Sequence, residues 1–205
     1  MKKLVSVLLA AVMLLCLCAC GAAQEVPKPE DTVVTFSDGM RDFDFEKMQG
    51  SLSASEENIQ SEIDDLESGN ELAAMFTGKI KEWAREQQYE IVRSETNGDT
   101  ATVEVKYSYV DSSPIVNAFF TEYLTRALTL AMQDATEEEI EAVAEEILSD
   151  KIQTGETGST ERTVTYTLKK ENEEWKIVSL PEDVMHIMTA DFVFALEQVA
   201  SAFGG

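Results

Sequence analysis

The chain has 205 residues, a length that suits one globular domain preceded by a short targeting segment. Hydrophobic residues make up 44% of it, enough for an ordinary buried core, and 39 acidic against 16 basic residues give a formal net charge of −23. That charge argues against a nucleic-acid-binding protein, which needs a clustered basic surface, and against electrostatic docking onto anionic lipid.

The N-terminus has the pattern of an export signal. Lys2 and Lys3 precede an apolar run over residues 4–17, which is too short for an ordinary membrane span. The stretch Leu17-Cys18-Ala19-Cys20 resembles the bacterial lipobox. That resemblance implies cleavage after Ala19 and transfer of diacylglycerol to the Cys20 thiol. A plain signal peptide with an incidental cysteine is the alternative.

The domain boundaries follow from this signal and from the composition behind it. We expect residues 1–19 to be a lipoprotein signal peptide and residues 20–30, which contain two prolines and no apolar periodicity, to be a tether. Residues 31–205 then form a single α+β domain. Because all three cysteines lie at or before position 20, this domain is expected to have no disulfide and no thiol chemistry.

Helices are predicted first in the domain. An apolar face at spacings of three and four begins near Asp31 and continues past a bend to Met48. Ser53 and Glu56 have the spacing of a capping box and are followed by a narrow apolar stripe at Ile59, Ile63 and Leu66. A third amphipathic helix is predicted over residues 72–83.

Two β-hairpins are predicted, the first over Tyr89–Asp111 and the second over residues 164–178. In the first, two strand-like runs meet at Asn97-Gly98-Asp99, and an Asn-Gly pair between such runs is a strong turn signal because both central residues need a positive φ. The second run alternates strictly, which predicts a strand with one face on a core. The residues expected on that face are Ala101, Val103, Val105, Tyr107 and Tyr109.

A pair of helices is predicted between the hairpins, over residues 114–151. The first starts at Pro114 and has an apolar face wide enough to predict a well-buried helix. Thr136 and Glu139 form a second capping box, which starts the other helix. After Pro181 the chain is expected to continue as a long apolar tail helix that packs on the domain.

This order of elements resembles the nuclear-transport-factor-2-like (cystatin-like) lipoproteins of unknown function found on Gram-positive cells. The resemblance rests on VVTFSDGMRDFDFEKM, YEIVRSETNGDTATVEVKYSYVD and TYTLKKENEEWKIV. It implies a curved antiparallel sheet of four or more strands that wraps around helices, with a pocket between them. The helical pair and the tail helix depart from the compact family pattern, so protein could fill that pocket.

Few residues suggest catalysis or metal binding. In enzymes of the resembled superfamily a carboxylate or a His–Asp pair commonly transfers protons, but the only histidine, His186, forms no recognisable motif with Asp183 and Asp191. A partly exposed helix histidine is the interpretation we prefer.

Two acidic stretches also fall short of a cation site. Asp42, Asp44 and Glu46 lack the glycine and the distal glutamate of a calcium loop. The acids Glu137–Glu139, Glu145 and Glu146 could attract divalent cations weakly, but a solvated, capped helix already explains them. We therefore expect no metal, no cofactor and no enzymatic activity.

Four aromatic residues on strand faces are the best candidates to line a pocket. Tyr107, Tyr109, Tyr166 and Trp175 are interpreted first as core residues and otherwise as the lining of an apolar pocket with polar tips. The primary hypothesis is a lipid-anchored, extracytoplasmic, non-enzymatic module that binds a small apolar ligand or a peptide. The alternative is an envelope protein–protein interaction module without a ligand, and an isomerase or hydrolase of the same fold comes third.

Overall fold

A computed structural model describes residues 27–54 and 71–204 of the chain. The predicted signal peptide, Cys20, most of the tether and the helix predicted after the capping box at Ser53 and Glu56 lie outside these residues. Within them, no helix combines the length and the apolar character that a bilayer-spanning segment requires.

The sheet has four antiparallel strands in the order β1-β2-β3-β4. They are β1 (Gln88–Asn97), β2 (Thr100–Asp111), β3 (Gly158–Glu171) and β4 (Glu174–Ser179). The central pair is the longest, with β2 and β3 in register from Thr100 opposite Lys169 to Asp111 opposite Gly158. The prediction of two hairpins whose strands pair with each other is therefore confirmed.

The turn of the first hairpin differs from the prediction by one residue. Asn97 pairs with Thr100, so the two turn residues are Gly98 and Asp99, and of these only Gly98 has a positive φ, at 62°. The prediction that Asn97 and Gly98 share the turn is wrong. Glycine at the first turn position suits a two-residue hairpin whose twist matches the strands.

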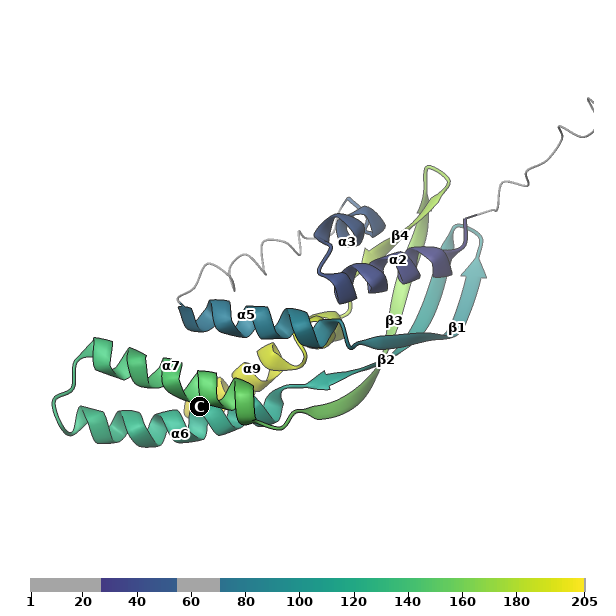
Figure 1. Ribbon diagram of the computed structural model, residues 1–205. Coiled ribbons are helices and arrows are strands. Elements are labelled where there is room, and N and C mark those ends of the chain that lie inside the picture. Colours follow the sequence, from purple (N-terminus) through teal and green to yellow (C-terminus); the bar gives the residue numbers. More distant parts are fainter. Residues whose placement is uncertain (1–26, 55–70, 205) are drawn as a thin grey trace, which may run out of the picture.

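The predicted alternation on β2 is confirmed, because its inward residues are buried and form one face of the main core. The main core lies between this face of the sheet and three helices: α2 (Pro29–Asp42), α3 (Phe45–Ser51) and α8 (Asp183–Met188). The helices contribute Val33, Phe36, Met40, Met48, Val184 and Ile187. Figure 1 shows α2 and α3 against the sheet.

The first helix begins two residues earlier than predicted. Pro29 lies in the first turn of α2, where proline is well tolerated because its missing N–H would have no helical partner. The Lys28 amide donates to the Asp31 carboxylate over 3.3 Å, which closes the helix start. The last two residues of the predicted tether are therefore helical.

A second cluster, the helical core, joins four further helices beside the sheet. These are α5 (Glu71–Ala84), α6 (Ser113–Ala131), α7 (Glu137–Thr154) and α9 (Phe192–Gly204). Its buried residues include Phe76, Ile80, Trp83, Ile115, Val116, Leu148 and Ala195. The Phe76 and Phe192 rings stack with their centroids 4.1 Å apart, which holds α9 against α5. The domain thus has two cores, one under the sheet and one among helices.

Helices α6 and α7 form the predicted antiparallel pair, here called the hairpin arm, which extends away from the sheet in Figure 1. Helix α6 is fully buried only at its base, so the prediction that the whole helix is well buried is wrong. Ile115 and Val116 are 1% exposed, whereas Leu128 is 67% exposed. The apolar face of α6 therefore continues past the part of the domain that covers it.

The predicted single tail helix is also wrong. The chain breaks into α8 and α9 at Thr189–Asp191, where Ala190 and Asp191 have φ values of 52° and 57°. A non-glycine residue in this left-handed region is uncommon, and two in a row are held by surrounding contacts. The predicted packing of the tail on the domain is confirmed near this break, since Val184, Ile187 and Ala195 are buried.

Candidate functional site

The four aromatic residues predicted as core or pocket lining are all buried. Tyr107 and Tyr166 are 0% exposed, Tyr109 is 4% exposed and Trp175 is 6% exposed, and all four belong to the main core. The Tyr107 hydroxyl lies 2.6 Å from the Ser37 hydroxyl and 2.8 Å from that of Tyr166. Burial raises the pKa of Tyr107 to about 12, although both hydrogen bonds oppose the shift. These rings act as core, and a ligand-lining role for them stays a prediction.

Trp175 borders a surface hollow of about 460 Å³ between α2, α3 and the start of β4. Two of the lysines that line it, Lys47 and Lys176, already have partners. The Lys176 ammonium donates to the Gly50 carbonyl over 2.7 Å and lies 2.9 Å from Glu174, and Lys47 lies 3.6 Å from Asp44. Trp175 donates its indole N–H to the Pro27 carbonyl over 3.0 Å. The hollow is open to solvent rather than an enclosed pocket.

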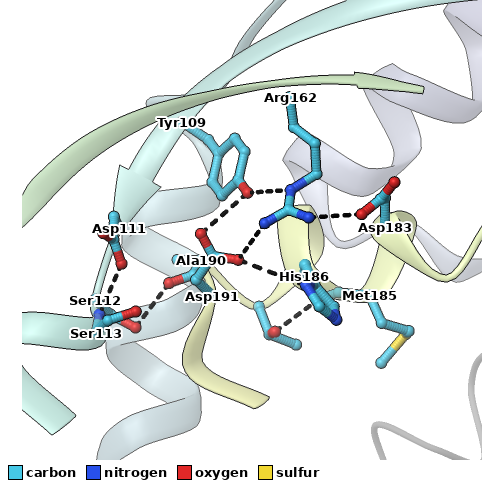
Figure 2. Close-up of polar contacts among 11 residues, drawn as sticks. Tyr109, Asp111, Ser112, Ser113, Arg162, Asp183, Met185, His186, Ala190 and Asp191 are labelled. Carbon is cyan, nitrogen blue, oxygen red and sulfur yellow. Dashed lines mark hydrogen bonds and ion pairs between the residues drawn. The ribbon is translucent and has the colours of Figure 1, made fainter. Parts of the chain in front are cut away.

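A charged cluster, here called the Arg162 cluster, joins the sheet to the break between α8 and α9 (Figure 2). The Arg162 guanidinium donates to Asp183 over 2.6 Å and to Asp191 over 3.3 Å. It also donates through Nε to the Tyr109 hydroxyl over 3.0 Å, and that hydroxyl donates to Asp191 over 3.0 Å. The cation of β3 therefore holds a tyrosine from β2, a carboxylate from α8 and a second carboxylate from the break before α9.

The cluster also fixes the base of the hairpin arm. Ser112, fully buried at the start of α6, donates its backbone N–H and its hydroxyl to the Ala190 carbonyl, over 2.9 and 2.7 Å. The Asp111 carboxylate accepts the Ser113 amide over 2.9 Å. These contacts, together with the Tyr109–Asp191 bond, hold the unusual backbone at the break in the tail against the end of β2.

The sequence argument named Asp183, His186 and Asp191 but missed Arg162. A signal was present, because Arg162 continues the inward positions Val164, Tyr166 and Leu168 of β3, and it lies opposite Tyr107. A cation at an inward position of a strand needs a buried acceptor, so this pattern predicts a carboxylate partner.

Proton transfer by a His–Asp pair is not supported by the geometry of this cluster. The His186 Nδ1 atom lies 3.8 Å from the nearer Asp191 oxygen, too far for a hydrogen bond, and the imidazole packs on Phe194 with centroids 4.9 Å apart. Burial raises the pKa of Asp191, while the Tyr109 hydrogen bond and the Arg162 charge lower it. With Arg162 holding both carboxylates, the arrangement is suited to fixing the helices in place.

The acidic residues considered as cation ligands have structural roles or face solvent. Asp44 is the N-cap of α3 and accepts the Lys47 amide over 3.1 Å, and Glu46 lies exposed in the first turn of that helix. Glu139 forms the predicted capping box with Thr136. Across residues 27–54 and 71–204, no three His, Cys, Asp or Glu side chains are placed to hold a metal ion.

The far end of the hairpin arm exposes large apolar side chains. We define residues 128–141 as the arm tip. Within it, Leu128 is 67% exposed and Met132 is 88% exposed. Figure 1 shows the tip at the end of the arm remote from the sheet. The sequence predicts a well-buried helix here as well, because an apolar stripe does not reveal which surface will cover it.

Comparison with known proteins gives one family and no individual relative. The family described as "Domain of unknown function (DUF5105)" matches residues 44–190, well over half of the chain. No curated protein matches the chain, and no solved structure matches it. The matched residues include the whole sheet, the hairpin arm and Arg162, whereas α2 and α9 lie outside them.

Proposed function

Since the chain belongs to the DUF5105 family, whose description assigns no activity, we propose its function from the geometry: a lipid-anchored, non-enzymatic interaction module that presents its hairpin arm to another envelope protein. The observation that carries the proposal is the exposure of Leu128 and Met132 at the arm tip, 67% and 88%. The base of the same arm is held in place by the Arg162 cluster.

Covering these two side chains gives a plausible source of binding energy. Full burial of a leucine or methionine side chain contributes about 1.5–3 kcal/mol, so a partner that covers both would gain roughly 3–6 kcal/mol before the costs of association. Leu128 and Met132 are four residues apart at the end of α6, so their side chains are neighbours on one surface. Contiguous exposed apolar surface, unlike single scattered apolar residues, marks interaction sites.

The anchor and the finer fold assignment belong to the same proposal. The lipobox resemblance supports acylation of Cys20, which would hold the domain on the outer face of the cytoplasmic membrane of a Gram-positive cell. A four-stranded antiparallel sheet packed with helices supports a nuclear-transport-factor-2-like roll, into which the hairpin arm is inserted between β2 and β3. Fold resemblance alone assigns no activity.

Binding of a small ligand or a peptide is the second candidate, and the hollow beside Trp175 is the observation that favours it. Its volume of about 460 Å³ would admit a small molecule. The arm remains the better candidate because Tyr107, Tyr109 and Tyr166 are committed to the main core. A proton-transferring enzyme has less support, since His186 and Asp191 are not hydrogen-bonded.

The proposal is tested by cross-linking from the arm tip in native membranes. Gln133→Cys gives the mature protein a thiol that is free for a short photoreactive maleimide, because the only other cysteine remaining after Ala19 is the acylated Cys20. This position is exposed at the arm tip and leaves both apolar side chains in place. Thr165→Cys, exposed on the open face of β3, is the matched control. We expect one discrete adduct from position 133, lost when Leu128→Asp is added, and none from position 165. Equal labelling from both positions, or none from 133, would contradict the proposal.

A further inference from the structure

The charges of the hairpin arm are distributed unevenly between its tip and the rest of the arm, here called the stem (residues 113–127 and 142–154). In the stem, Glu122 lies 2.7 Å from Lys151, and Glu146 lies 3.2 Å from Arg126. Lys151 also lies 3.2 Å from Asp150. Arg126 and Lys151 are the two basic residues of the arm, and they pair with these three carboxylates of the stem.

The tip carries carboxylates without cations. Residues 128–141 contain Asp134, Glu137, Glu138, Glu139 and Glu141 and no lysine or arginine. In the part of the chain that the structure describes, no ion pair reaches any of these five side chains, and all five are exposed. The apolar side chains of Leu128 and Met132 lie within this acidic segment.

Helix stability explains only part of the acidic tip. Glu137, Glu138 and Glu139 occupy the first turn of α7, where the helix dipole favours negative charge, and Glu139 caps the helix. Asp134 precedes the helix in the loop, and Glu141 lies beyond the first turn. Concentrated like charge destabilises the compact state, and these two side chains have no internal compensation.

We infer that the partner presents lysine and arginine side chains around an apolar depression that receives Leu128 and Met132. This inference rests on the proposed function and specifies the chemistry of the partner. Electrostatic complementarity raises association rates and excludes wrong partners, and an exposed acidic rim around apolar anchors is suited to that role.

The same charges disfavour the other occupants of the tip. A second copy of this chain would bring two acidic tips together, each with five carboxylates and no cation. Anionic lipid and nucleic acid would meet the same repulsion. A cationic protein surface is the occupant that both the charge and the apolar side chains favour.

The experiment measures the yield of the Gln133→Cys adduct in native membranes carrying the full chain. The test variant combines Glu137→Lys, Glu138→Lys and Glu141→Lys. The matched control combines Glu46→Lys, Glu90→Lys and Glu156→Lys, which changes the net charge equally at exposed positions away from the tip. We expect the tip variant to lower the yield at least about tenfold and the control to change it less than about twofold. Raising the salt concentration from 0.05 to 0.5 M should lower the yield of the parent protein.

A synthetic probe identifies the charge of the partner independently. An amphipathic helical peptide of leucine and lysine should compete with the native adduct, whereas its leucine–glutamate counterpart and Ca²⁺ alone should not. If the adduct forms and neither the tip variant nor the lysine peptide affects it, the cationic partner is refuted while the interaction module stands. Competition by Ca²⁺ alone would show cation screening in place of docking and would also refute the inference. If no adduct forms in the parent protein, the proposed function itself fails.

Discussion

Replacing Tyr107 by phenylalanine should destabilise the domain more than the same change at Tyr166. The Tyr107 hydroxyl is the middle member of a buried chain, 2.6 Å from Ser37 and 2.8 Å from Tyr166. All three residues are 0% exposed. Tyr107→Phe therefore leaves two buried hydroxyls without their shared partner, whereas Tyr166→Phe leaves the Ser37–Tyr107 bond intact.

The expected losses of stability follow from the number of buried hydroxyls that lose a partner. A buried polar group left unsatisfied costs about 1–3 kcal/mol, so Tyr107→Phe should lower the free energy of unfolding by roughly 2–4 kcal/mol. Tyr166→Phe should cost only about 1 kcal/mol, the typical net value of one hydrogen bond. Tyr123→Phe, at a half-buried position on the hairpin arm, is the control and should change stability by less than about 0.5 kcal/mol.

Urea unfolding followed by tryptophan fluorescence measures all three variants. The order Tyr107→Phe, Tyr166→Phe, Tyr123→Phe, from largest loss to smallest, is the prediction. If Tyr107→Phe were as mild as the Tyr123 control, the hydroxyl chain would not be a closed part of the core. A solvated pocket lined by these tyrosines would then explain the result better.

Three further predictions concern ionisation, charge and backbone geometry. Because the pKa of Tyr107 is raised from 10 to about 12, the folded state keeps this proton at pH values where the unfolded state loses it, and the free energy of unfolding should fall by about 3 kcal/mol as pH rises from 10 to 12. Tyr107→Phe should reduce this loss in alkaline unfolding curves. An unchanged curve would contradict the assignment of the loss to Tyr107. Arg162→Met leaves Asp191 without its cation, so the free energy of unfolding should fall by roughly 2–4 kcal/mol at neutral pH. The loss should partly recover towards pH 4, because protonation of Asp191 favours the folded state. A loss that is independent of pH would count against the ion pair. Gly98→Ala should cost about 1–2 kcal/mol in thermal unfolding, because the φ of Gly98 is +62°. Gly50→Ala in α3 is the control: an added Cβ meets no atom within 4 Å there, so this change should be neutral or stabilising in the same assay.

The sheet was predictable because strict alternation carries enough information to fix a strand and its faces. Val103, Val105 and Tyr107 are buried as the period of two requires. The turn was missed by one residue because Asn97-Gly98 and Gly98-Asp99 both satisfy hairpin preferences, and the pairing of Asn97 with Thr100 decides between them.

The arm and the charged cluster show what the sequence does not determine. A helical apolar stripe states that a face will be covered, but it does not distinguish the domain's own core from another molecule, so the exposure of Leu128 was missed. The break in the tail depends on tertiary contacts, because Ala190 disfavours a positive φ and Asp191 only tolerates one. Arg162 could have been identified from its inward position on β3, although its partners, 21 and 29 residues away, could not.

The most direct test of the interaction module is the accessibility of the arm tip on intact cells. The measurement is the rate at which a membrane-impermeant maleimide modifies Gln133→Cys, relative to Thr165→Cys, on cells and on the purified protein. The account predicts that the rate ratio falls at least several-fold on cells, because a partner covers the tip and leaves the open sheet face free. An equal ratio on cells and on purified protein would contradict the claim that the hairpin arm is the docking element.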